Sequence, residues 1–152
     1  MAIVQDIFNP APAVGYPGMV ANGETSNRIS RTVEDAAGIA FGKAAFRGSG
    51  DHGVTATPAA GTFMGIVMAD HGLAVVPGGP AADIVPQYRE AGLLNEGQIW
   101  VTAGSNTTDG AAVYVTSGFV FTATSSGNTA IPAVFDDTVS SGALVRLRVR
   151  RS

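Results

Sequence analysis

Segments with the composition of β-strands recur about every 10 to 15 residues along most of this chain, and turn residues separate them. In 28–34, polar and apolar residues alternate as they do in a half-buried strand. Further strands are expected at 39–47, 62–68, 98–103, 112–116, 119–124, 131–135 and 143–149. Because no segment of ten residues has a helical period, the pattern predicts one all-β domain, an antiparallel β-sandwich or barrel-like fold.

Two parts of this pattern need separate comment. The stretch 81–94 is interrupted by Pro86 and is assigned as a strand, although a helical turn would also fit. The segments 98–103, 112–116 and 119–124 follow one another across short turns, which predicts a meander. In the last of them, the alternation places Phe119 and Phe121 together on the side that faces the core.

The first 27 residues form an extended arm that cannot fold by itself. Pro10, Pro12 and Pro17 fix φ and remove N–H groups, which excludes a helix or a central strand across 10–17. The arm is nevertheless too apolar for a linker, and its large apolar residues are Met1, Ile3, Val4, Ile7, Phe8, Val14, Tyr16, Met19 and Val20. We therefore predict an arm at 1–27 and a β-domain at 28–152, with the arm lying either on its own domain or on a neighbouring subunit.

The composition limits the partners of the chain. Charged residues make up 14% of it, well below the roughly 25% of ordinary domains, so much of the surface is neutral. This suits a surface that partners cover, or else a β-protein with uncharged turns. The net charge of −3 argues against a nucleic-acid partner, and no apolar run is long enough for a membrane helix. With no cysteine, disulfides and thiolate metal sites are excluded.

Two motifs that resemble chemical sites do not meet the requirements of the chemistry. The segment 48–53 has the letters of the dinucleotide fingerprint G-x-G-x-x-G, but the helix that would hold a pyrophosphate does not follow it. His52 and His71 each stand between an aspartate and a glycine, yet an adjacent Asp and His in a strand point to opposite faces. Both are read as ordinary loop histidines. No catalytic residue, cofactor or metal is therefore expected.

The C-terminal segment 145–151 places arginines on one face of a strand, at Arg146, Arg148 and Arg150. These arginines could form a solvated face, meet an acidic neighbouring subunit, or bind nucleic acid. If the face is solvated, the acidic partners within the chain are expected to be Glu34, Asp35, Asp136 and Asp137. Trp100 is either a rim residue or an interface anchor.

Several segments together resemble the structural cement proteins of tailed bacteriophages. The resemblance lies in the arm and in segments 27–34, 38–42, 61–66, 97–101, 112–115 and 142–147. It implies a small virion protein on the outer surface of the capsid that bridges major capsid protein subunits and brings no catalytic residues. Such proteins form trimers or dimers, and a trimer is favoured because capsid lattices offer many local threefold axes.

These observations together predict an assembly interface and leave one alternative. The expected interface residues are Ile7, Phe8, Tyr16, Met19, Val20, Arg28, Arg31, Trp100, Arg146 and Arg148. The alternative is a carbohydrate- or receptor-binding β-module of a virion or cell surface, which would also be poor in helix and in charge. Such a module would need a cluster of exposed aromatic residues.

Overall fold

The computed structural model describes residues 15–73 and 78–150. Within these ranges the chain contains strands and no helix, which confirms the all-β prediction. The strands are β1 (Asn27–Val33), β2 (Ile39–Ala40), β3 (Ala44–Arg47), β4 (Gly53–Thr55), β5 (Phe63–Val67), β6 (Ile84–Val85), β7 (Glu90–Thr102), β8 (Ala112–Val115), β9 (Phe121–Thr122), β10 (Thr129–Phe135) and β11 (Leu144–Val149).

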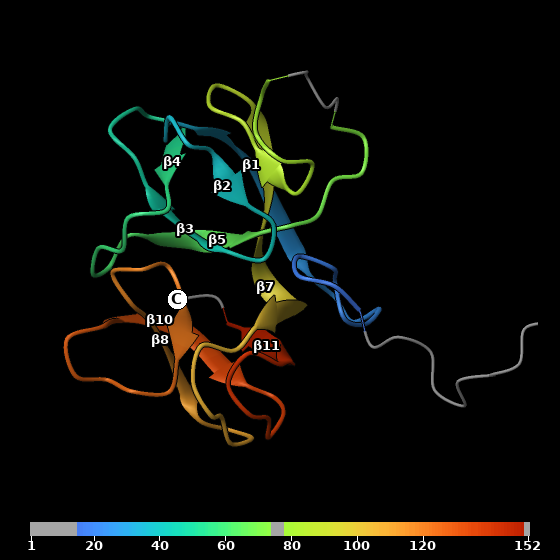
Figure 1. Ribbon diagram of the computed structural model, residues 1–152, viewed down its shortest axis with the longest axis vertical. Helices are drawn as coiled ribbons and strands as arrows, with labels where there is room; N and C mark the ends of the chain where they lie inside the picture. The colour runs from blue at the N-terminus through green and yellow to red at the C-terminus, as the bar shows by residue number, and fades with distance from the viewer. Residues whose placement is uncertain (1–14, 74–77, 151–152) are drawn as a thin grey trace, which may run out of the picture.

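The long strand β7 connects two halves of the molecule, which lie above and below it in Figure 1. Its first part pairs with β1 on one side and with β5 on the other, so that Leu93 faces Ile29 and Val67. From Gly97 onward it pairs instead with β11. Gly97 has φ +129, a backbone conformation that favours glycine, at the residue where the partner changes.

The first half is a closed ring of strands, which we call the N-terminal barrel. Its order is β1-β4-β3-β5-β7, and β7 pairs again with β1 to close the ring. The pairing of β1 with β4 is parallel, with Thr32 opposite Gly53, whereas the other neighbours in the ring are antiparallel. The short pair β2–β6 adds Ile39 and Val85 to the buried interior.

The second half, which we call the C-terminal lobe, continues from β7 through β11, β10 and β8 to β9. A parallel bridge between Ala103 and Phe121 brings β9 back to the end of β7. The Gly104 N–H donates to the Phe121 carbonyl at 2.8 Å, so this lobe also closes on itself. The barrel-like form predicted from the strand pattern is therefore present.

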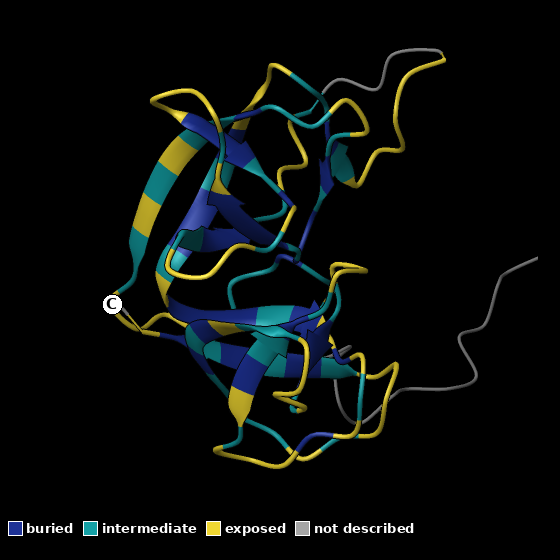
Figure 2. Cartoon of the chain, turned by 90° about the vertical axis from the view of Figure 1, so that its left-hand side faces the viewer, coloured by how far each residue is buried: buried dark blue, intermediate teal, exposed yellow. Residues whose placement is uncertain are grey.

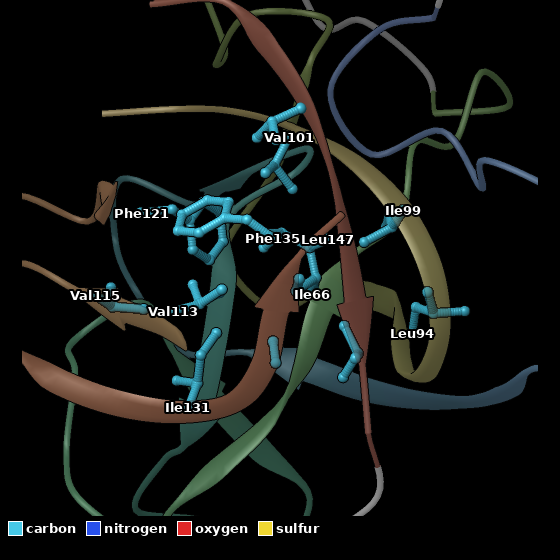
Figure 3. Close-up of a cluster of buried hydrophobic side chains, with 14 of the residues drawn as sticks. Ile66, Leu94, Ile99, Val101, Val113, Val115, Phe121, Ile131, Phe135 and Leu147 are labelled. Carbon is cyan, nitrogen blue, oxygen red and sulfur yellow. The ribbon is translucent and has the colours of Figure 1, made fainter. Parts of the chain in front are cut away.

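The core shows why the two halves stay together. Leu93 points into the N-terminal barrel, where it joins Val33 and Val67 in one buried cluster. Its neighbour Leu94 points the other way and joins the cluster of the C-terminal lobe. Figure 3 shows Leu94 and Ile66 from the first half with the side chains of the second, and Figure 2 shows exposed residues mainly in the loops. The C-terminal lobe thus packs against the outer face of the barrel.

Some strand predictions were wrong in detail. The expected strand 39–47 is divided into β2 and β3, because Gly42 has φ +72 and lies against Pro17, where a Cβ would be 2.8 Å from the Pro17 Cβ. The predicted meander is present only in part, since β8 pairs with β9 as expected, but β7 pairs with β11 instead of β8. Phe119 is not a core residue: it is 41% exposed with φ +62, in the turn before β9.

Candidate assembly surface

The described part of the arm lies on its own domain. The Gly18 N–H donates to the Trp100 carbonyl at 2.8 Å, and the Trp100 N–H donates to the Met19 carbonyl at 2.9 Å. Val20 is bridged to Ile99 and packs against the C-terminal core. We call residues 15–26 the arm root. It lies along β7 on the side opposite β11 and so covers an edge that would otherwise be open.

Trp100 is half-buried because the arm root and an arginine lie on it. Gly15 is so close that a Cβ there would be 2.7 Å from Trp100 Cδ1, and its φ is +149. The Arg146 guanidinium carbon is 5.6 Å from the centre of the indole ring, in cation–π geometry.

The arginines on β11 are paired within the chain. Arg146 binds Asp137 through both its side chain and its backbone N–H. Arg148 donates to Asp136 at 3.1 Å and to Glu24 of the arm root at 2.8 Å. These contacts raise the pKa of both arginines, chiefly through the side-chain hydrogen bonds, and the Arg146 contact lowers the pKa of Asp137. The Arg148 contact also fastens the arm root to the lobe.

Of the four expected acidic partners, Glu34 and Asp35 do not meet the arginines. Asp35 accepts hydrogen bonds from the Thr55 hydroxyl and the Ala56 N–H, both at 2.6 Å. The Glu34 carboxylate lies against the glycine-rich loop 48–53, where it accepts hydrogen bonds from the Ser49 and Gly50 N–H groups at 2.8 and 2.7 Å. These backbone donors lower the pKa of Glu34.

The glycine-rich loop therefore does bind a carboxylate, but the carboxylate belongs to the chain itself. A Cβ at Gly53 would lie 1.6 Å from Glu34 Oε1, and one at Gly48 would lie 2.3 Å from Oε2. A larger residue at either position would have to displace the Glu34 carboxylate from its backbone donors. Consecutive backbone N–H groups commonly surround an anion. The G-x-G-x-x-G pattern is usually associated with a pyrophosphate, whereas the anion here is the carboxylate of Glu34.

Neither histidine belongs to a metal cluster within 15–73 and 78–150. His71 Nε2 lies 2.7 Å from the Tyr16 hydroxyl, and the two rings meet edge to face with centroids 5.2 Å apart. Tyr16 is 42% exposed. Its contact with His71 is a second attachment of the arm root, on the side of the N-terminal barrel.

The remaining predicted interface residues are spread over the surface. Arg28 and Arg31 lie on β1, where Arg28 is exposed and contacts the Ser26 hydroxyl at 3.3 Å, while Arg31 donates to the Ser30 carbonyl. The structure does not bring these two into the cluster of Trp100, Arg146 and Arg148. Ile7 and Phe8 lie outside the described residues.

The sequence analysis missed Tyr88, the most exposed aromatic residue in the described part of the chain. Tyr88 is 78% exposed and has φ +63, in the turn between β6 and β7. A bulky residue in this conformation is strained, and strain of this kind is retained where the surrounding structure requires it. The only signal in the sequence was a tyrosine two residues after Pro86, inside the stretch that was hardest to assign.

Comparisons with known proteins agree with this fold. Among solved structures, the chain is similar to one from the capsid of Myoviridae phage XM1, with a TM-score of 0.66, 18% identity and 97% of each chain covered. It is also similar to the head fiber gp8.5 N base of bacteriophage phi29, with a TM-score of 0.47, 14% identity, and 84% of this chain and 97% of that chain covered. No curated protein matches.

The chain thus shares its fold with a protein in a solved phage capsid structure. A family model described as structural cement protein (E217 gp24/Pam3 gp6) matches residues 4–150. The chain belongs to this family of phage cement proteins. It is a structural protein of the virion that associates with the capsid in a decoration role.

Proposed function

We propose that this protein binds the outer face of the phage head and bridges major capsid protein subunits, which stabilises the shell. The observation that carries the proposal is the family match, because it extends over the domain and most of the arm. The arm root supports it as well. Residues 18–21 of the arm root are held on β7 by backbone hydrogen bonds, so the arm is attached to the domain at a fixed place.

The attachment surface would combine the arm with the surface around Trp100. Ile7 and Phe8 would supply apolar contacts, and Tyr16, Met19 and Val20 would hold the arm root in position. Arg146 and Arg148 would enter the interface already paired with carboxylates of the same chain. Such pairs direct orientation more than they add affinity, so the apolar residues of the arm would carry most of the binding energy.

Arg28, Arg31 and the exposed Tyr88 lie away from Trp100 and would serve a second contact. A bridging protein needs two such contacts, one for each neighbour. We favour a trimer over a dimer, since a local threefold axis lets three arms engage at once and linked contacts bind much more tightly than single ones. The role is non-catalytic, which agrees with the structural character of the family. It requires no nucleic acid or membrane, and the net charge of −3 suits a protein that does not contact DNA.

The test is binding to capsids that lack the protein. Removing residues 1–14 leaves the arm root on β7, so we expect a folded protein with much reduced occupancy on the capsid. In the full chain, Ile7→Ser with Phe8→Ser removes two large apolar side chains and should weaken capsid binding by roughly 100-fold or more. The matched control is Gln5→Ser with Asn9→Ser, which should bind normally. Full occupancy by the protein without residues 1–14 would refute the role of the arm.

A further inference from the structure

A groove separates the N-terminal barrel from the C-terminal lobe on the side where the arm root crosses. It encloses about 450 Å³ and is lined by residues from both halves, among them Phe41 from the first and Phe121 from the second. Tyr16 and Pro17 of the arm root form part of its wall. Its volume lies within the range of roughly 300 to 1,000 Å³ that is usual for binding pockets. We call it the inter-lobe groove.

The groove continues past Lys43 into a second hollow of about 470 Å³. Ala40 and Lys43 line both spaces, so the two adjoin at these residues. Ile39, Ile84 and the half-exposed Phe119 line the second space. The two hollows therefore adjoin and have mainly apolar walls.

Lys43 lies where the two hollows meet and has no acidic partner among the described residues. Its Nζ donates to the Phe119 carbonyl at 3.1 Å. Within the part of the chain that the structure describes, it forms no ion pair, although Asp83 lines the same groove. Burial lowers the pKa of Lys43, which shows that its charge is poorly solvated. An ammonium group has three donors, so a carboxylate entering the groove would find a ready partner.

The N-terminal arm has the matching pattern. Asp6 carries the only charged side chain among residues 1–14, and it stands between the apolar pairs Ile3–Val4 and Ile7–Phe8. The two hollows also contain Asp83 and Asp35, and Asp35 already accepts hydrogen bonds from Thr55 and Ala56. An extended peptide with one carboxylate between large apolar residues fits the apolar walls of the groove when its carboxylate lies at the Lys43 ammonium.

The geometry favours the arm of another copy over the chain's own arm. Tyr16 and Pro17 already form the groove wall, and at Gly15 the chain lies against the Trp100 ring. Pro10 and Pro12 favour extended backbone at and before them, which opposes a sharp return into the same groove. From Gly15 back to Asp6, an extended chain covers about 30 Å, which is enough to reach a neighbouring domain.

We propose that the inter-lobe groove receives residues 3–8 of the N-terminal arm of a second copy of this chain, with Asp6 paired to Lys43. The copies are thereby joined by exchange of arms. The inference rests on the proposed function in treating the arm as an attachment device, but it replaces the direct capsid contact of Ile7 and Phe8 with a contact to a sister subunit. Loss of residues 1–14 would then lower capsid occupancy through loss of the oligomer. Contact with the capsid would then come from the remaining surface and from the ordered oligomer.

Disulfide trapping tests this directly, because the chain has no cysteine of its own. Full-length Asp6→Cys protein is mixed with full-length Lys43→Cys protein of different mass and oxidised mildly. We expect a mixed disulfide between the two chains on a non-reducing gel. The matched control is Arg47→Cys, which lies on β3 outside the groove and should trap far less. Equal trapping at both positions would overturn the proposal. A double variant that closes the disulfide within one chain would overturn it too.

Charge exchange provides a second readout in solution. Asp6→Lys and Lys43→Glu should each weaken self-association at least about tenfold in sedimentation experiments, since each leaves an unpaired or repelled charge. The two changes combined in one chain should restore it. Lys43→Met keeps the apolar stem and removes the charge, so it should also weaken self-association, and it provides a second test if Lys43→Glu does not fold. Self-association that none of these variants alters would refute the pairing.

Capsid binding separates this inference from the proposed function. If trapping succeeds and the protein does not bind capsids, the capsid role fails and the arm exchange stands. If trapping fails while removal of residues 1–14 abolishes capsid occupancy, the arm binds the capsid, and the arm exchange is refuted.

Discussion

The N-terminal barrel and the C-terminal lobe are both built from β-strands, but they differ in how many faces of those strands are buried. In the barrel, β3, β5 and the first part of β7 are covered on both faces, one by the barrel interior and the other by the C-terminal lobe. In the lobe, β11 is covered on one face only, and its other face carries Arg146 and Arg148. Strands with two buried faces read as continuous apolar runs, whereas strands with one read as alternation.

The largest expected effect concerns the two faces of β7. Leu93 and Leu94 are adjacent and both fully buried, but Leu93 faces the barrel interior and Leu94 faces the C-terminal lobe. Leu93→Ala and Leu94→Ala should each cost about 2 to 5 kcal/mol in the free energy of unfolding, measured by denaturant titration. Hydrogen exchange should separate them.

Leu93→Ala should reduce protection mainly in the N-terminal barrel, and Leu94→Ala should reduce it in both halves. Each variant serves as the control of the other, because residue type, strand and burial are the same. If both variants gave the same pattern of protection, the two halves would unfold as one unit and would not differ in local stability.

A smaller effect is expected at the rim of the barrel, where the glycine-rich loop holds Glu34. Gly53→Ala places a methyl group in the space of the carboxylate, which must then move away from the Ser49 and Gly50 N–H groups, so the denaturant midpoint should fall modestly. Gly23→Ala is the matched control, since nothing lies within 4 Å of a Cβ there. Combining Gly53→Ala with Glu34→Ala should cost less than the two changes added separately. Strict additivity would show that Glu34 is not the obstacle.

The two halves also differ in how much the sequence could predict. In β11 the alternation of polar and apolar residues predicts the strand and its outer arginines, because the pattern is local and one face meets solvent. Of the four acidic residues expected as partners, Asp136 and Asp137 do pair with these arginines. In the barrel, the sequence predicts one continuous strand at 39–47, whereas the structure has two. Its division depends on the arm root packing against Gly42, which no local pattern records.

The same distinction applies to the candidate surface. The arm was recognised from its prolines and apolar residues, which are properties of the segment alone. That its root pairs with β7, and that Arg148 holds Glu24, depend on contacts between distant parts of the chain. Lys43 gave no signal in the sequence, because an ordinary lysine near a glycine acquires meaning only from the apolar groove around it.

The smallest effect is expected on the solvent-facing side of the C-terminal lobe. The hydrogen bond from Arg146 holds the pKa of Asp137 below its ordinary value of about 3.9, so the folded state binds this proton less readily than the unfolded state does. The pair therefore contributes stability above pH 4, and the contribution is lost as the pH falls below 4 through the folded-state pKa.

Asp137→Asn should then cost no more than about 1 kcal/mol at neutral pH, since both side chains of the pair are partly exposed. Between pH 5 and 2, its unfolding free energy should fall less steeply than that of the unaltered protein. Asp51→Asn, at an exposed position of the barrel, should leave the slope unchanged. Because Glu34 and Glu90 of the barrel also have lowered pKa values, part of the acid dependence should remain in every variant. An unchanged slope in Asp137→Asn would mean that the Arg146–Asp137 pair adds nothing to the stability of the lobe.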